Sequence, residues 1–294
     1  MTSDSVNPAT VSTSTTLAET VVGPAMNVAQ GFSSRPPSLG MGFDKALRGG
    51  TEADLRRLDQ ELDFSWQPDL ASVFAEAIER ARSPGSPWIT IAPVLLLGED
   101  GVGRIHVARR FAHLAGVPYA TLDLDDVEVV ERLQGVIRGP DVVIPTAPVL
   151  AMAASGCANP VVTVLGADSV AESVQMDLAR MIDPATADRW VDWSVGATID
   201  LRQVSWFVQA RQPERLAAPL LELLRPVELI RPSGTNRLLH VAEVIAEVMV
   251  DENARPSTGR HLQSLLHRLQ AMPDGRSTSD LYAAARRVAR NDQI

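Results

Sequence analysis

The stretch "LLLGEDGVGRIHVARR", residues 95–110, joins an apolar run to an amphipathic segment through a turn rich in glycine. A short apolar run is typical of a strand buried on both faces of a parallel sheet. A strand, a glycine turn and a helix in this order form the frame of a phosphate-binding loop, whose backbone N–H groups surround phosphates. The alternative is a tight turn that only connects a strand with a helix.

A working loop of this kind also needs a lysine for the β- and γ-phosphates and a Ser or Thr hydroxyl for Mg²⁺. Arg104 and Ile105 hold those two positions, and Glu99 and Asp100 place carboxylates beside them. The planar guanidinium of arginine does not reproduce a compact ammonium group, and isoleucine cannot bind a metal. The stretch therefore predicts the backbone of a phosphate loop without its chemical side chains.

Strand and helix patterns alternate around this loop. We expect strands at 93–97, 119–124, 161–165, 204–210 and 227–230, and helices at 69–82, 104–115, 148–155 and 170–182. This order implies a parallel sheet covered by helices on both faces. After Pro232, apolar residues at helical spacing predict three further helices at 238–249, 261–272 and 279–290.

Composition suggests how the chain is divided. The first residues are rich in Ser and Thr, and such segments do not bury enough apolar surface to fold. We expect a flexible tail, a helical lead-in, an α/β subdomain and a helical lid, at residues 1–40, 41–85, 86–232 and 233–294.

Charge and composition also limit the function. A net charge of −9 argues against a nucleic-acid surface, and no apolar run reaches the roughly 20 residues of a membrane helix. No secretory signal is recognisable, and the single Cys157 excludes an internal disulfide. We expect a bacterial cytoplasmic protein without nucleic-acid or membrane partners. The Ser/Thr-rich tail and a lone lysine, Lys45, leave an exported protein as an alternative.

Beyond the loop, the sequence resembles the ATPase module of Lon-type AAA+ proteins over about residues 60–290. The similarity is carried by "GEDGVGRIHVARRFAHLAGVPYATLDL" (98–124), "NPVVTVLGADS" (159–169), and "APLLELLRPVELIRPSG" (218–234). Asp183-Pro184, Asp192 and Asp200-Leu201 also match the family pattern. The resemblance implies an α/β fold, a P-loop NTPase (AAA+) core with a parallel sheet, followed by a small all-helical lid domain.

The same resemblance shows which catalytic groups are missing. The family's Asp-Glu pair aligns with Leu165 and Gly166, and Asp168 lies beyond it. The other departures are Arg211 at the sensor asparagine, Leu223 at the arginine finger with Arg225 nearby, and Pro140-Asp141 near the pore-loop aromatic residue. A Ser–Lys protease dyad is not expected, because the only lysine is at position 45.

The resemblance thus implies no catalytic residue. It leaves a vestigial nucleotide-binding set that consists of Gly98, Gly101, Gly103, Arg104 and the lid residue Arg276. No metal site is expected, since none of His106, His113, His240, His261 and His267 shows metal-ligand spacing with a partner carboxylate. Trp190 and Trp193, on either side of Asp192, are expected in the core, with a partner contact as the alternative.

Two functions remain open. The first is a pseudo-ATPase that serves as a scaffold or regulatory subunit, assembled with a protein partner or an active AAA+ relative in a homo- or hetero-oligomer. The second is an AAA+ ATPase with weak binding of ATP or ADP, without tight Mg²⁺. The first is favoured because phosphoryl transfer depends on the missing groups, and an arginine finger alone contributes about 10³–10⁵ in rate.

Overall fold

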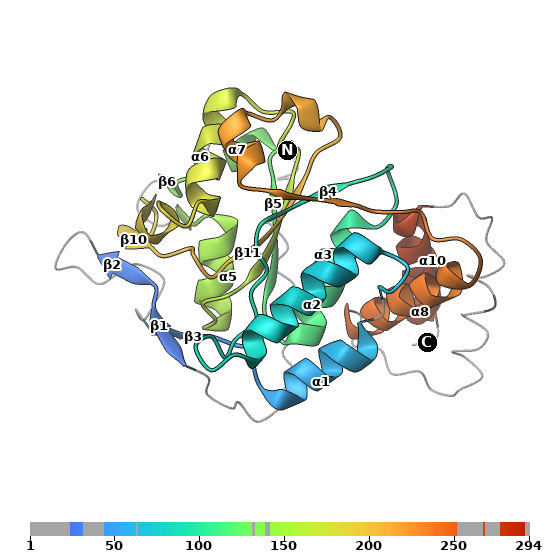
Figure 1. Cartoon of the computed structure of the whole chain (residues 1–294). Coiled ribbons are helices and arrows are strands. Elements are labelled where there is room, and N and C mark those ends of the chain that lie inside the picture. The colour runs from blue at the N-terminus through green and yellow to red at the C-terminus, as the bar shows by residue number, and fades with distance from the viewer. Residues whose placement is uncertain are drawn as a thin grey trace.

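The computed structural model describes residues 24–31, 44–62, 64–130, 133–138, 142–251, 267 and 277–291. Within them, five parallel strands form one sheet in the order β12-β4-β11-β8-β5 (Figure 1). Their bounds are Val94–Leu97 for β4, Tyr119–Asp123 for β5, Val161–Leu165 for β8, Ser205–Gln209 for β11 and Arg225–Glu228 for β12. The predicted parallel sheet is confirmed, and only β12 starts and ends two residues early.

The edge position of β12 explains this shift. Pro226 lies inside the strand, where it offers no N–H group to a neighbour. β12 pairs with β4 alone, so its other side needs no hydrogen bond and tolerates proline.

Helices cover both faces of the sheet because alternate strand residues point to opposite sides. Val94 and Leu96 pack in one core with α1 (Glu52–Glu61), α2 (Pro68–Arg82) and α3 (Arg104–Ala115). Leu95 and Val164 pack in the other core, with α5 (Ala147–Ser155), α6 (Glu172–Ile182) and α7 (Ala218–Glu222). The short helix α4 (Val127–Val130) follows β5. The predicted helices at 69–82, 104–115, 148–155 and 170–182 are therefore present.

Short antiparallel strands lie beside this body. β6 (Val136–Arg138) pairs with β7 (Val142–Ile144), and β9 (Trp190–Asp192) forms a hairpin with β10 (Ala197–Ile199). β2 (Ala29–Gly31) adds to β10, and β1 (Ala25–Asn27) pairs with β3 (Asp44–Ala46).

The expectation of a flexible tail does not hold for residues 25–31. Val28 and Ala29 are buried in the core beside β10, and the carbonyl of Val28 accepts a hydrogen bond from the N–H of Asp200. The burial of Val28 and Ala29 and this backbone hydrogen bond hold the segment against β10. The other residues of the expected tail, apart from Pro24, lie outside the described residues, and the proposed domain boundaries remain predictions.

The lid consists of α8 (Gly234–Asp251) and α10 (Thr278–Asn291), which lie together beside α3 (Figure 1). Their small shared core contains Val241, Val244, Ile245, Val248, Leu281 and Ala285. These two helices confirm the predictions at 238–249 and 279–290. The helix predicted at 261–272 lies outside the described residues except for His267. None of the described helices combines the length and apolar character that crossing a membrane requires.

Candidate functional site

The glycine loop joins the carboxyl end of β4 to the start of α3. Gly98, Gly101 and Gly103 have φ angles of 123°, 79° and 105°, which side chains other than glycine rarely adopt. A Cβ at Gly98 would lie 2.6 Å from the carbonyl oxygen of Leu229, and one at Gly101 would lie 2.5 Å from the Cβ of Ser277. The three glycines are thus required by the backbone conformation and, at Gly98 and Gly101, by close packing.

Arg104 turns back into the loop that it follows. Its guanidinium donates hydrogen bonds to the carbonyl of Gly98 at 3.2 Å and to the carboxylate of Asp100 at 2.8 Å, and its side chain is only 10% exposed. The cation at the lysine position therefore has partners within the protein and points at a carbonyl and a carboxylate.

The other loop carboxylate has its own cation. Arg231 donates from Nε and Nη2 to Glu99 at 3.1 and 3.0 Å, and its Nη2 also bonds the carbonyl of Asp100 at 3.2 Å. Nε of Arg211, at the sensor position, lies 3.8 Å from the Asp100 carboxylate. Because both carboxylates are exposed, each ion pair contributes at most about 1 kcal/mol. Each loop carboxylate is therefore paired with an arginine, and the two acidic groups occupy cations that could otherwise face a phosphate.

The lid rests directly on this loop. The N–H and the hydroxyl of Thr278, the first residue of α10, both donate to the carbonyl of Gly101, at 2.8 and 2.9 Å. Ser277 and Asp280 cap the helix start through reciprocal hydrogen bonds. Arg276 lies outside the described residues, so its nucleotide-binding role stays a prediction.

The positions of the acidic pair lie at the carboxyl end of β8, on the same sheet edge as the loop. Gly166 has a φ of 69°, and a Cβ there would lie 2.5 Å from Oδ1 of Asp125. Oδ2 of the buried Asp168 accepts hydrogen bonds from the N–H groups of Arg211 and Gln212, at 3.1 and 2.8 Å. Asp168 therefore holds the turn that follows β11.

We expect Asp168→Ala to lower the free energy of unfolding by about 1–3 kcal/mol, because two backbone donors lose a charged acceptor. Urea unfolding of the full chain measures this loss. Asp177→Ala is the control, since Asp177 forms only a surface pair with Arg180 and its removal should cost about 1 kcal/mol or less. Equal losses in the two variants would contradict a structural role for Asp168.

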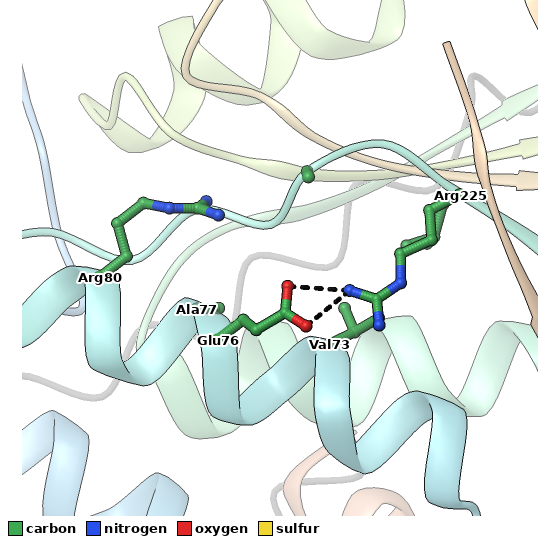
Figure 2. Close-up of a pocket in the computed structure, with 7 residues that line it drawn as sticks. Val73, Glu76, Ala77, Arg80 and Arg225 are labelled. Carbon is green, nitrogen blue, oxygen red and sulfur yellow. Dashed lines mark hydrogen bonds and ion pairs between the residues drawn. The ribbon is translucent and has the colours of Figure 1, made fainter. Parts of the chain in front are cut away.

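Arg225 is the arginine nearest in sequence to the finger position. It lies at the amino ends of the parallel strands, whereas the glycine loop lies at their carboxyl ends. It pairs with Val94 at the start of β4, whereas the glycine loop follows the end of that strand. Its Nη1 bonds both carboxylate oxygens of Glu76 at 2.8 Å, in the pocket of Figure 2 that also contains Val73 and Arg80. Arg225 is thus tied to α2. The pore-loop position near Pro140-Asp141 lies outside the described residues.

The two tryptophans of the β9–β10 hairpin differ. Trp190 is buried as expected, but Trp193 is 57% exposed, so the core prediction is wrong for it. The reason is the turn after Asp192, whose buried carboxylate accepts from the N–H groups of Ser194 and Val195 and so turns the chain before Trp193 can follow the strand.

Behind the loop, the structure brings together three side chains that could bind a metal ion and that the sequence analysis did not connect. Ligand atoms of His106 on α3 and of His240 and Glu243 on α8 all lie within 4.8 Å of one another, and all three residues are buried. Burial lowers the pKa of His106 to about 4 and the pKa of His240 to about 3, so both imidazoles are neutral at pH 7. The prediction of no metal-ligand arrangement overlooked the spacing His240-x-x-Glu243, which places both side chains on one helix face.

No family model matches the chain. Similarity to curated proteins is clear. Lon protease 2 of Thermus thermophilus is 28% identical over 159 residues, which are 52% of this chain and 20% of that protein. Lon protease 1 of Sorangium cellulosum is 30% identical over 156 residues, 51% of this chain and 19% of that protein. The mitochondrial Lon protease homolog of Phaeodactylum tricornutum is 23% identical over 238 residues, 80% of this chain and 26% of that protein.

The matched region spans only about a fifth to a quarter of the length of these relatives. The similarity confirms the resemblance to a Lon-type AAA+ module that the sequence motifs indicated.

Proposed function

We propose that this Lon-like AAA+ module is a pseudo-ATPase that acts as a non-catalytic scaffold or regulatory subunit. The observation that carries the proposal is the position of Arg104. A phosphate-binding cation must face the phosphates, but Arg104 bonds the Gly98 carbonyl and the Asp100 carboxylate. Ile105, at the position of the metal-binding hydroxyl, is 44% exposed and offers no oxygen.

The site of water activation supports the same proposal. Catalysis of phosphoryl transfer consists of positioning and electrostatic stabilisation, which need a metal-binding Asp and a group that orients water. Leu165 and Gly166 stand at those positions, and Asp125 fills the space beside Gly166. Asp125 thus occupies the space that a side chain at position 166 would need. A single substitution of Gly166 would therefore not restore the group that orients water.

We extend the proposal to assembly with a protein partner or an active AAA+ relative in a homo- or hetero-oligomer. The net charge of −9 favours a protein over nucleic acid or an anionic membrane. A bacterial cytoplasmic location is part of the proposal. Light scattering of the purified chain, alone and with an active Lon-type protein, would test assembly, and a monomer in both samples would contradict it.

The second candidate, weak binding of ATP or ADP without hydrolysis or with slow hydrolysis, is favoured by the intact loop backbone. Gly98, Gly101 and Gly103 keep the positive φ angles of a turn that exposes N–H groups. Calorimetry with each nucleotide, with and without Mg²⁺, separates the two candidates.

We expect ATP turnover by the purified full chain to equal that of its Arg104→Ala variant, because the metal-binding hydroxyl and the acidic pair are missing from their positions at Ile105, Leu165 and Gly166. Phosphate release at saturating ATP and Mg²⁺ measures this. The double variant Arg104→Lys with Ile105→Thr is the informative control. It restores the two loop side chains and should gain nucleotide affinity without turnover. Turnover that disappears in Arg104→Ala would overturn the pseudo-ATPase proposal.

A further inference from the structure

We propose that His106, His240 and Glu243 bind a divalent transition-metal ion, with Zn²⁺ as the best match, and that this ion fastens the lid helix α8 to α3. The three residues come from two elements that are far apart in the chain, and they meet directly behind the glycine loop. The proposal goes beyond the pseudo-ATPase function and does not depend on it.

The nitrogen atoms that face one another carry the argument. His106 and His240 are each only 2% exposed, and Nε2 of His106 and Nδ1 of His240 are buried without a hydrogen bond in the described part of the chain. Nε2 of His106 lies 3.5 Å from Oε2 of Glu243, and the two imidazole rings meet edge to face with centroids 5.0 Å apart. A buried polar atom without a partner costs about 1–3 kcal/mol, a cost that metal ligation would remove.

Hydrogen bonds behind His240 leave its inner nitrogen with a lone pair. In the tautomer that binds a metal, the hydroxyl of Thr278 donates to the carbonyl of Gly101 at 2.9 Å and accepts from Nε2–H of His240 at 3.0 Å. Nδ1 of His240 then carries no proton and can bind a metal.

A similar contact orients His106. Its Nδ1 lies 2.9 Å from the hydroxyl of Tyr282 on α10, while its Nε2 faces Glu243. Metal-binding histidines almost always use their second nitrogen in this way, because an outer hydrogen bond fixes both tautomer and ring orientation.

The ligand set indicates the class of ion. Two imidazoles and one carboxylate suit Zn²⁺ and related transition metals, whereas Mg²⁺ and Ca²⁺ prefer oxygen ligands. Three protein ligands leave a fourth position for water or for the second oxygen of Glu243. The nearby cations Arg109 and Arg110 do not exclude an ion, since each forms an ion pair with Glu247.

The site would connect the lid to the loop through a short path. His240 contacts Thr278, which holds the carbonyl of Gly101, so a metal that fixes His240 also fixes the start of α10 against the loop. The ion would thus stabilise a closed lid without any nucleotide.

The test uses the full chain after removal of metals with a chelator. Titration with Zn²⁺ in a calorimeter and with Co²⁺ in a spectrophotometer should give one equivalent, with the visible Co²⁺ bands typical of tetrahedral coordination. Zn²⁺ should also raise the thermal unfolding temperature, because the ion binds the folded state. His240→Gln and Glu243→Gln should each weaken binding by more than the roughly 10–100-fold typical of an outer partner, and Tyr282→Phe by about that amount.

His113→Gln is the matched control. His113 lies on the same helix as His106 but contacts Glu247, and its substitution should leave Zn²⁺ affinity unchanged. Urea midpoints of the metal-free proteins verify that each variant folds. The proposal is overturned if the wild-type chain binds no metal. It is equally overturned if His240→Gln and Glu243→Gln bind as tightly as wild type, which would mean a surface site or a plain His106–Glu243 contact.

Discussion

Glu247→Ala is expected to lower the stability of the lid by about 3–5 kcal/mol, because it removes one side of a buried ion-pair cluster. Glu247 lies on α8 and is only 1% exposed. Its Oε1 is 2.9 Å from Nδ1 of His113 and 3.4 Å from Nη1 of Arg110, both on α3. Without the carboxylate, the buried guanidinium of Arg110 keeps, among the described residues, a distant contact to Glu61 at 4.0 Å.

The electrostatics of Glu247 explain why this loss is large. Burial by itself raises the pKa of Glu247, but the hydrogen bond and charge of His113, with the charge of Arg110, outweigh it and hold the pKa below its ordinary value. The carboxylate is therefore charged at pH 7, and its charge has several partners that alanine would leave behind. Because the folded pKa is lowered, this contribution is complete above the unfolded pKa of about 4.3 and is lost as pH falls below it.

Hydrogen exchange and urea unfolding together measure the effect, since the lid can open before the sheet unfolds. Glu247→Ala should lose protection in α8 and α10 first. Glu247→Gln should lose less, because its amide oxygen still accepts from His113. Glu79→Ala, which breaks an exposed pair with Arg82, serves as the surface control and should leave the protection of α8 and α10 unchanged. A loss no larger than that of the surface control would show that α8 is held to α3 by apolar contacts alone.

The sheet was predictable because its strands are short apolar runs at regular spacing and its helices have clear amphipathic faces. α3, for example, begins and ends at the predicted residues, since Gly103 and Gly116 stand at its two ends. Strand β2 (Ala29–Gly31) was not predictable, because its partner β10 is distant in sequence and its own residues have no alternating pattern. Pairing between remote segments decides such strands, and local patterns do not contain that information.

The candidate site was likewise predictable only in part. The loss of the lysine and hydroxyl positions could be read directly from the loop, but the partners of Arg104 could not, because they depend on the fold of the loop. The contact of Thr278 with Gly101 joins residues 177 positions apart, and His106 lies 134 positions before His240. Only the spacing of His240 and Glu243 was visible in the sequence, and without the third residue it does not define a site.

Phe111→Ala is expected to cost about 3–5 kcal/mol of global stability, because it leaves a cavity in the middle of the core. Phe111 is fully buried on α3, the helix that carries the loop. Its ring stacks on Phe74 of α2 with centroids 4.9 Å apart and lies 6.4 Å from Phe207 of β11. Since three elements meet at this ring, its removal weakens the attachment of α3 to both α2 and the sheet.

Urea unfolding distinguishes this core effect from a change at the loop. A cavity should lower the midpoint with an unchanged slope, because the same surface is exposed on unfolding. Phe111→Leu should recover part of the loss by refilling the cavity. Ile105→Ala, on the exposed side of the same helix, should change stability by about 0.5 kcal/mol or less. If Phe111→Ala matched Ile105→Ala, α3 would be anchored by its contacts with the lid, and Glu247 would then be the residue on which the position of the loop depends.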